Sequence, residues 1–71
     1  MRKINFRQLH IFLCKNGFKK IRQKGSHARY TNGYLKCTIT VRNNNYVYNQ
    51  GTLKKILMDC NMEYNQLMTY L

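Results

Sequence analysis

A basic segment, residues 22–27 with the sequence Arg-Gln-Lys-Gly-Ser-His, holds the side chains of this chain that are best suited to chemistry. Histidine exchanges protons near neutral pH, so His27 could take the proton from an RNA 2′-hydroxyl, whose oxygen would then attack the adjacent phosphorus. Arg22, Lys24 and the nearby Arg29 could stabilise the negative charge that develops on the phosphate. The same residue types could also bind nucleic acid without cutting it, and the sequence leaves both roles open for His27.

Other catalytic schemes lack the groups they need. The two acidic residues, Asp59 and Glu63, lie far along the chain from residues 22–27 and supply neither a carboxylate pair for glycoside hydrolysis nor a cluster for two-metal catalysis. Ser26 has no third group that would orient it with His27 as a nucleophile and base. The Lys-Ser/Thr pair of a phosphate-binding loop is also missing. We therefore expect no metal ion and no cofactor.

The charge of the chain indicates a polyanionic partner. Its 71 residues include 13 lysines and arginines against 2 acidic residues, a formal net charge of +11. Nucleic acid, an anionic membrane surface and an acidic protein all fit this excess. No segment has the ~20 apolar residues that a membrane span needs, and the N-terminus lacks the apolar region of a signal peptide. We expect a cytoplasmic protein that does not contact a membrane.

Three isolated cysteines, Cys14, Cys37 and Cys60, show no Cys-x-x-Cys spacing that would suit zinc, and their odd number argues against a disulfide framework. Each falls within an apolar pattern. We therefore expect three buried free thiols in a reducing compartment.

Three helices are predicted from apolar residues at helical spacing. The first covers residues 6–15 and is followed by Gly17, which suits the left-handed conformation at a helix end. His10 lies beside the apolar stripe of this helix, so we expect it at the boundary of the core or on the surface. The residues expected to cap the helices at their N-termini are Asn5 for the first, Asn49 or Thr52 for the second and Asn61 for the third.

Three antiparallel strands are predicted between the first two helices, at residues 18–24, 27–31 and 34–42. Gly25-Ser26 forms the first turn, and Asn32-Gly33 matches a type I′ hairpin turn. Along the third strand, side chains alternate between two faces. One face carries Leu35, Cys37, Ile39 and Val41, and the other carries Lys36, Thr38, Thr40 and Arg42.

This order of elements predicts an α+β fold in a single domain, residues 1–71, with helices on one face of the sheet and a basic face left free. The residues expected to bind RNA there are Arg22, Lys24, Gly25, Ser26, Arg29 and Lys36. Four tyrosines lie among or beside the strands, where they could stack on bases or pack on the sheet. They are Tyr30, Tyr34, Tyr46 and Tyr48.

Three motifs resemble the HicA family of toxin ribonucleases: Gly17-Phe18, the Arg-Gln-Lys-Gly-Ser-His run of residues 22–27, and the Gly-Thr-Leu-Lys-Lys-Ile-Leu segment of residues 51–57. The resemblance covers nearly the whole chain. It implies the α-β-β-β-α fold of double-stranded-RNA-binding domains, here with a short extra C-terminal helix. It also implies a type II toxin that cleaves mRNA, with His27 as the catalytic residue. The partner that it implies is a HicB-like antitoxin that covers the active site.

The chain departs from this family after the third strand. Many members carry a proline and a second histidine there, whereas residues 41–45 read Val-Arg-Asn-Asn-Asn. The general acid for the leaving 5′-oxygen is therefore open between Arg42, Lys24 and water. A non-catalytic RNA-binding module with the same fold is the main alternative, and a basic adaptor for an acidic protein is a third possibility.

Overall fold

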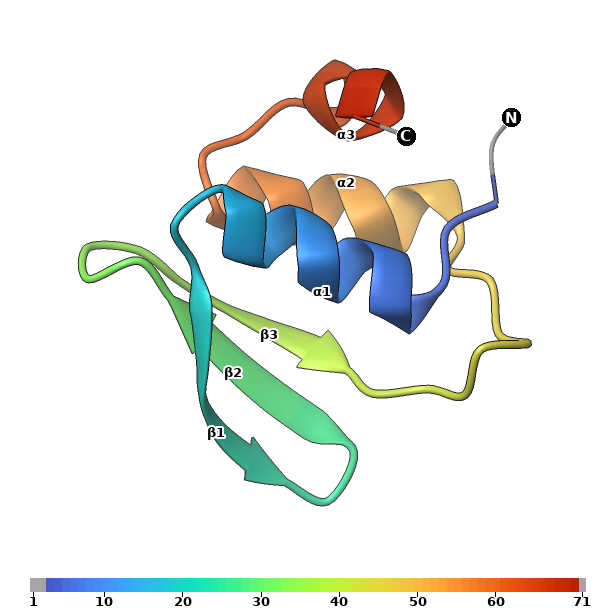
Figure 1. The fold of residues 1–71 in the computed structure, drawn as a ribbon. Coiled ribbons are helices and arrows are strands. Elements are labelled where there is room, and N and C mark those ends of the chain that lie inside the picture. The colour runs from blue at the N-terminus through green and yellow to red at the C-terminus, as the bar shows by residue number, and fades with distance from the viewer. Residues whose placement is uncertain (1–2, 71) are drawn as a thin grey trace.

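Six elements follow one another in the computed structural model, which describes residues 3–70. They are α1 (Phe6–Lys15), β1 (Lys19–Lys24), β2 (His27–Thr31), β3 (Lys36–Thr40), α2 (Gln50–Asp59) and α3 (Tyr64–Tyr70). The strands form one antiparallel sheet in the order β1-β2-β3, and α1 and α2 lie side by side over one of its faces (Figure 1). The predicted two-layer α-β-β-β-α sandwich with an extra C-terminal helix is confirmed.

Helix α1 is fixed at both ends by the residues that the sequence indicated. The side chain of Asn5 accepts from the backbone N–H of Gln8 at 3.0 Å, and the side chain of Gln8 accepts from the N–H of Asn5 at 2.9 Å. This reciprocal pair is a capping box. At the other end Gly17 has a φ of 87°, and the N–H of Phe18 donates to the carbonyl of Leu13 at 3.0 Å. Such a bond satisfies a carbonyl at the helix end and turns the chain toward β1.

Asn49 caps α2, where its side chain accepts from the N–H of Thr52 at 2.7 Å. The prediction that Asn61 caps the third helix is wrong. Asn61 follows the end of α2 with a φ of 55°, and the N–H of Met62 donates back to the carbonyl of Leu57 at 2.8 Å. Asparagine tolerates the left-handed conformation better than most residues, so Asn61 ends α2 in the way that Gly17 ends α1.

The strands are shorter than predicted at their outer ends. β1 begins at Lys19 and β3 covers Lys36–Thr40 instead of residues 34–42. The side chain of Asn32 accepts from the backbone N–H groups of Tyr34 and Leu35, at 2.9 and 2.7 Å. These bonds keep the two residues in the turn between β2 and β3 instead of in the ladder. The prediction of a type I′ turn at Asn32-Gly33 is wrong, because that turn needs a positive φ at both residues and Asn32 does not have one.

The core lies between the sheet and the helices. Its fully buried members include Leu9 and Leu13 of α1, Tyr30 of β2, Ile39 of β3 and Leu57 of α2. No helix within residues 3–70 is long and apolar enough to cross a membrane.

Two of the three cysteines are buried, and the expectation for the third is wrong. Cys37 and Cys60 lie in the core, but Cys14 is exposed. Helix α1 turns Leu9 and Leu13 inward. Cys14 is rotated by about 100° from Leu13, which takes it off the buried stripe.

Candidate nucleic-acid interface

The pairing of β1 with β2 sets which side chains of β1 reach the outer face of the sheet, away from the helices. Lys20 pairs with the buried Tyr30, but the next paired residue is Arg22, which lies opposite the exposed Arg29. Ile21, between them, has no partner. From the turn, residues 22–24 pair without interruption with residues 27–29, so the turn register sets Arg22 on the same face as Arg29. The extra residue shifts the register only of Lys20 and Lys19, which lie beyond it.

His27 lies in a row of three side chains on this outer face. It pairs with Lys24 of β1 on one side and with Thr40 of β3 on the other. The next row contains the pair of Arg22 and Arg29. Directly opposite residues on antiparallel strands have Cβ atoms about 4.5–5.5 Å apart. The fold therefore places His27 among several cations on a rigid surface.

A shallow depression of ≈ 180 Å³ forms where these two rows meet. Its lining residues are Arg22, Lys24, His27, Arg29 and Thr38. Four of them are predicted site residues. Thr38 was not predicted as one, although the alternation of β3 had placed it on the basic face. The His27 side chain is exposed and forms no hydrogen bond with another residue of the described part of the chain. Its ring nitrogens are therefore open to a ligand.

The turn that precedes His27 is held by hydrogen bonds to its two backbone carbonyls. Gly25 has a φ of 59°, in the left-handed region that favours glycine. The side chain of Gln23 donates to the carbonyl of Gly25 at 3.1 Å, and the N–H of Val41 donates to the carbonyl of Ser26 at 2.6 Å. Gly25 and Ser26 therefore shape the turn beside the depression and are not among its lining residues.

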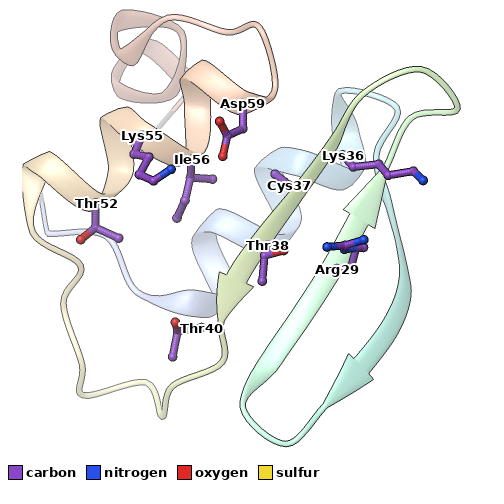
Figure 2. Close-up of a pocket in the computed structure, with 9 residues that line it drawn as sticks. All are labelled: Arg29, Lys36, Cys37, Thr38, Thr40, Thr52, Lys55, Ile56 and Asp59. Carbon is purple, nitrogen blue, oxygen red and sulfur yellow. The ribbon is translucent and has the colours of Figure 1, made fainter.

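Lys36 lies at the far end of the sheet from this turn, where it pairs with Thr31. Together with Arg29 it borders a larger groove of ≈ 390 Å³ between β3 and α2 (Figure 2). Of the predicted phosphate-binding cations, Arg22, Lys24 and Arg29 thus meet around His27, and Lys36 extends the basic face away from it.

The second histidine, His10, contacts residues of the protein itself. Its Nδ1 lies 2.6 Å from the hydroxyl of the buried Tyr30. Burial, above all, raises the pKa of Tyr30 to about 12. The phenol therefore stays protonated at neutral pH and shares a hydrogen bond with the His10 ring. The His10 Nε2 atom lies 3.7 Å from the sulfur of Cys14. His10 is half-buried at the boundary of the core, as predicted.

Two of the four tyrosines cannot stack on a base, because Tyr30 and Tyr48 are buried. The hydroxyl of Tyr48 donates to the carbonyl of Thr40 and so ties the loop after β3 to the sheet. The ring of Tyr46 lies edge-on to Tyr48 at 5.3 Å and carries the Arg42 guanidinium 4.2 Å from its centroid. Arg42 is not among the residues that line the depression.

The negative side chains lie outside the depression. Asp59 is on α2 and Glu63 precedes α3. Within residues 3–70, no three His, Cys, Asp or Glu side chains gather in a way that could hold a metal ion. The depression around His27 is therefore lined by cations and by no carboxylate, and such a surface favours a phosphate backbone.

The sequence model of one protein family, described as the HicA toxin of bacterial toxin–antitoxin systems, matches residues 6–62. No curated protein and no solved structure gives a match. The matched segment spans most of the 71 residues and includes every side chain that lines the depression around His27. The chain therefore belongs to the HicA family of toxins from bacterial toxin–antitoxin systems.

Proposed function

We propose that this toxin is an endoribonuclease that cleaves mRNA, with His27 as the acid–base residue. The observation that carries the proposal is the position of His27 between Lys24 and Thr40, in a depression lined by three cations. A histidine placed there can accept a proton, and its positive neighbours can hold the phosphate that reacts.

The proposed reaction needs no group beyond the RNA and these side chains. The imidazole of His27 removes the proton from a 2′-hydroxyl, and the 2′-oxygen attacks the neighbouring phosphorus. The bond from phosphorus to the 5′-oxygen then breaks, which leaves a 2′,3′-cyclic phosphate on one product and a 5′-hydroxyl on the other. Arg22 and Arg29 stabilise the charge on the phosphoryl oxygens, because their guanidinium groups are permanently positive and bind phosphate with two donors.

The leaving 5′-oxygen must receive a proton. Arg42 stacks on Tyr46 outside the depression, and a guanidinium does not release its proton in proteins. Lys24 lies directly opposite His27 and can either donate a proton or stabilise the oxygen while water supplies one. We therefore assign the protonation of the leaving oxygen to Lys24, directly or with the help of water.

The antitoxin partner that family membership implies is a HicB-like protein that covers the basic face and competes there with RNA. The proposed substrate and the proposed partner both support a cytoplasmic location. The cations around His27 would repel a divalent ion, so the proposed reaction proceeds without a metal. Lys36, Gly25 and Ser26 contact RNA around the depression and do not take part in the reaction.

The decisive experiment compares two histidine variants on one RNA substrate. The His27→Ala variant should keep its fold and bind RNA within about twofold of the parent, but its cleavage rate should fall by about 10²–10⁴-fold. The matched control is His10→Gln, which changes the other histidine and leaves the outer face intact, so the folded fraction should cleave normally. Cleavage by the His27→Ala variant at the parent rate would remove His27 from the mechanism.

Removal of metal ions tests the second part of the proposal. Addition of EDTA should leave the cleavage rate unchanged, and added Mg²⁺ should lower RNA affinity only as other salts do. A rate that falls with EDTA and returns with Mg²⁺ would show that the reaction needs a metal.

One observation favours a second candidate, a non-catalytic RNA-binding module. The ring of His27 has no hydrogen-bond partner among the described residues that would orient it, whereas a catalytic histidine is commonly held by a neighbouring group. Parent protein that binds RNA but leaves it uncut under all conditions would establish this candidate instead.

A further inference from the structure

The outer edge of β3 exposes backbone groups that no other strand of residues 3–70 pairs with. The N–H of Val41 donates to the carbonyl of Ser26 in the turn before β2, at 2.6 Å. Backbone groups along an antiparallel ladder alternate in direction. The backbone N–H of Val41 points toward β2, so the backbone groups of every second residue from Val41 do the same. The N–H and C=O groups of the residues between them, Lys36, Thr38 and Thr40, therefore point to the free edge.

The two edges of the sheet differ in how they are protected. Edge strands are usually shielded by charged side chains or by bulges. β1 has a bulge at Ile21 and four exposed cations, Lys19, Lys20, Arg22 and Lys24. β3 pairs in regular register and has one cation, Lys36. The hydroxyl of Tyr48 donates a hydrogen bond to the carbonyl of Thr40, which lies at one end of this edge. β3 is therefore open to a further strand.

A groove of ≈ 390 Å³ runs along this open edge. Figure 2 shows Thr52, Lys55, Ile56 and Asp59 projecting from α2 toward β3. The floor of the groove includes Cys37 and Ile56, and both are buried and largely apolar. β3 has 5 residues, which corresponds to a strand of about 17 Å.

The charged side chains that line the groove favour a negatively charged ligand. Arg29, Lys36 and Lys55 contribute three positive charges, and Asp59 contributes one negative charge. Arg29 and Lys36 stand on the outer face of the sheet. An added strand would present every second side chain beside them, and its other side chains would lie toward Ile56 on α2.

We propose that this groove binds an extended acidic segment of a partner protein, which adds to β3 as a fourth strand. Its backbone bonds with Lys36 and Thr38, and its acidic side chains alternate along the face that carries Arg29 and Lys36. Strand addition to an exposed sheet edge is a common mode of peptide recognition, with affinity from the backbone and specificity from alternate side chains. A nucleic acid lacks the regular alternation of backbone donors and acceptors that this edge matches, so the occupant is a polypeptide.

The groove adjoins the depression around His27. Arg29 and Thr38 line both, so a strand bound at β3 would reduce the access of RNA to the basic face. The identification of the acidic segment with part of the antitoxin rests on the proposed function. The fit of the groove to an acidic strand does not depend on it.

The test titrates the full-length ¹⁵N-labelled protein with a blocked synthetic heptapeptide in which valine and glutamate alternate. We expect amide shifts and slower amide exchange at Lys36, Thr38 and Thr40. A control peptide carries N-methyl groups on alternate amides and cannot donate to the edge, and a second control has lysine in place of glutamate. Neither control should bind.

Two protein variants with the same net charge distinguish binding in the groove from a general effect of protein charge on peptide affinity. Lys55→Glu reverses a charge that lines the groove and should lower peptide affinity about fivefold. Lys54→Glu changes the neighbouring residue of α2, which is exposed outside the groove, and should lower it less than about twofold.

Three results would overturn the proposal: no change at β3 with millimolar peptide, changes confined to the surroundings of His27, or equal losses from Lys55→Glu and Lys54→Glu. Because the titration contains no RNA, its outcome is independent of whether the toxin cleaves mRNA. A failure of the cleavage experiments would leave the peptide result standing, and the reverse also holds.

Discussion

Lys24 and His27 lie directly opposite each other across β1 and β2, at the tip of a hairpin that extends beyond the helices (Figure 1). Two residues, Gly25 and Ser26, separate them, so the tight turn itself brings the amine and the imidazole to the same face of the sheet. The distance between these groups therefore depends on the hairpin and not on the packing of the helices. A core mutation that leaves the hairpin folded should leave this pair intact.

The pair of Arg22 and Arg29 places two like charges opposite each other, which destabilises an antiparallel sheet. The Arg22→Gln variant should therefore raise the free energy of unfolding by about 0.2–1 kcal/mol at low salt. It should also weaken RNA binding and reduce the slope of log affinity against log salt by about 1. Urea denaturation and salt-dependent binding measure the two effects.

The control for this variant is Arg42→Gln, which removes the same charge from a residue that stacks on Tyr46. It should not stabilise the fold, because Arg42 has no arginine opposite it within the described sheet. An Arg22→Gln protein that is less stable than the parent at low salt, or whose salt slope is unchanged, would contradict the prediction.

The sequence predicted both hairpins and placed Arg22 on the basic face, but it predicted neither the bulge at Ile21 nor the wider turn between β2 and β3. The turn residues Gly25 and Gly33, with φ values of 59° and 99°, are local signals that need no knowledge of the rest of the fold. The bulge at Ile21 has no such signal. It lies between the pair of Lys20 with the buried Tyr30 and the pair of Arg22 with the exposed Arg29, and the residue types around it do not mark its position.

The remaining errors have a similar origin. Asparagine is favoured both as an N-terminal cap and in the left-handed position after a helix. Asn61 takes the second role because it follows closely after the end of α2. Cys14 belongs to an apolar sequence pattern, but it lies about 100° around α1 from Leu13, off the stripe that faces the core. Composition alone does not encode either choice.

The hydrogen bond between His10 and Tyr30 predicts a stability effect without a catalytic effect. His10→Ala leaves the buried Tyr30 hydroxyl without this hydrogen-bond partner, which should cost about 1–3 kcal/mol. Cleavage per folded molecule should stay at the parent level, since His10 lies on the opposite side of the sheet from His27. Chemical denaturation and cleavage at a temperature where both proteins are folded test this. A fall in cleavage that exceeds the fall in folded fraction would assign His10 a part in the reaction.

Stability should decline at high pH because of Tyr30. Burial raises its pKa from 10.0 to about 12 in the folded chain, so between these values the folded state keeps a proton that the unfolded state has lost. The free energy of unfolding therefore falls as pH rises across this interval. Burial raises the pKa of Tyr48 in the same direction, also to about 12. The phenolate absorbance of the 6 tyrosines should show two that titrate late.

The Tyr30→Phe variant separates this effect from the deprotonation of lysines, which affects both proteins alike. It should be less stable than the parent near pH 7, because it loses the bond to His10, but its stability should fall less steeply above pH 10. Parallel pH profiles for the two proteins would show that Tyr30 does not cause the decline.

The three thiols should react at very different rates. Cys14 is exposed on α1, whereas Cys37 and Cys60 are buried. A hydrogen bond with Cys37, followed by burial, raises the pKa of Cys60, so its thiol stays protonated. Because the thiolate is the reactive form, iodoacetamide should label only Cys14 in the native protein and all three cysteines in urea, as mass spectrometry would show. The Cys14→Ser variant should take up no label until it unfolds. Native labelling of Cys37 or Cys60 at a rate close to that of Cys14 would mean that the contact between β3 and the end of α2 opens readily.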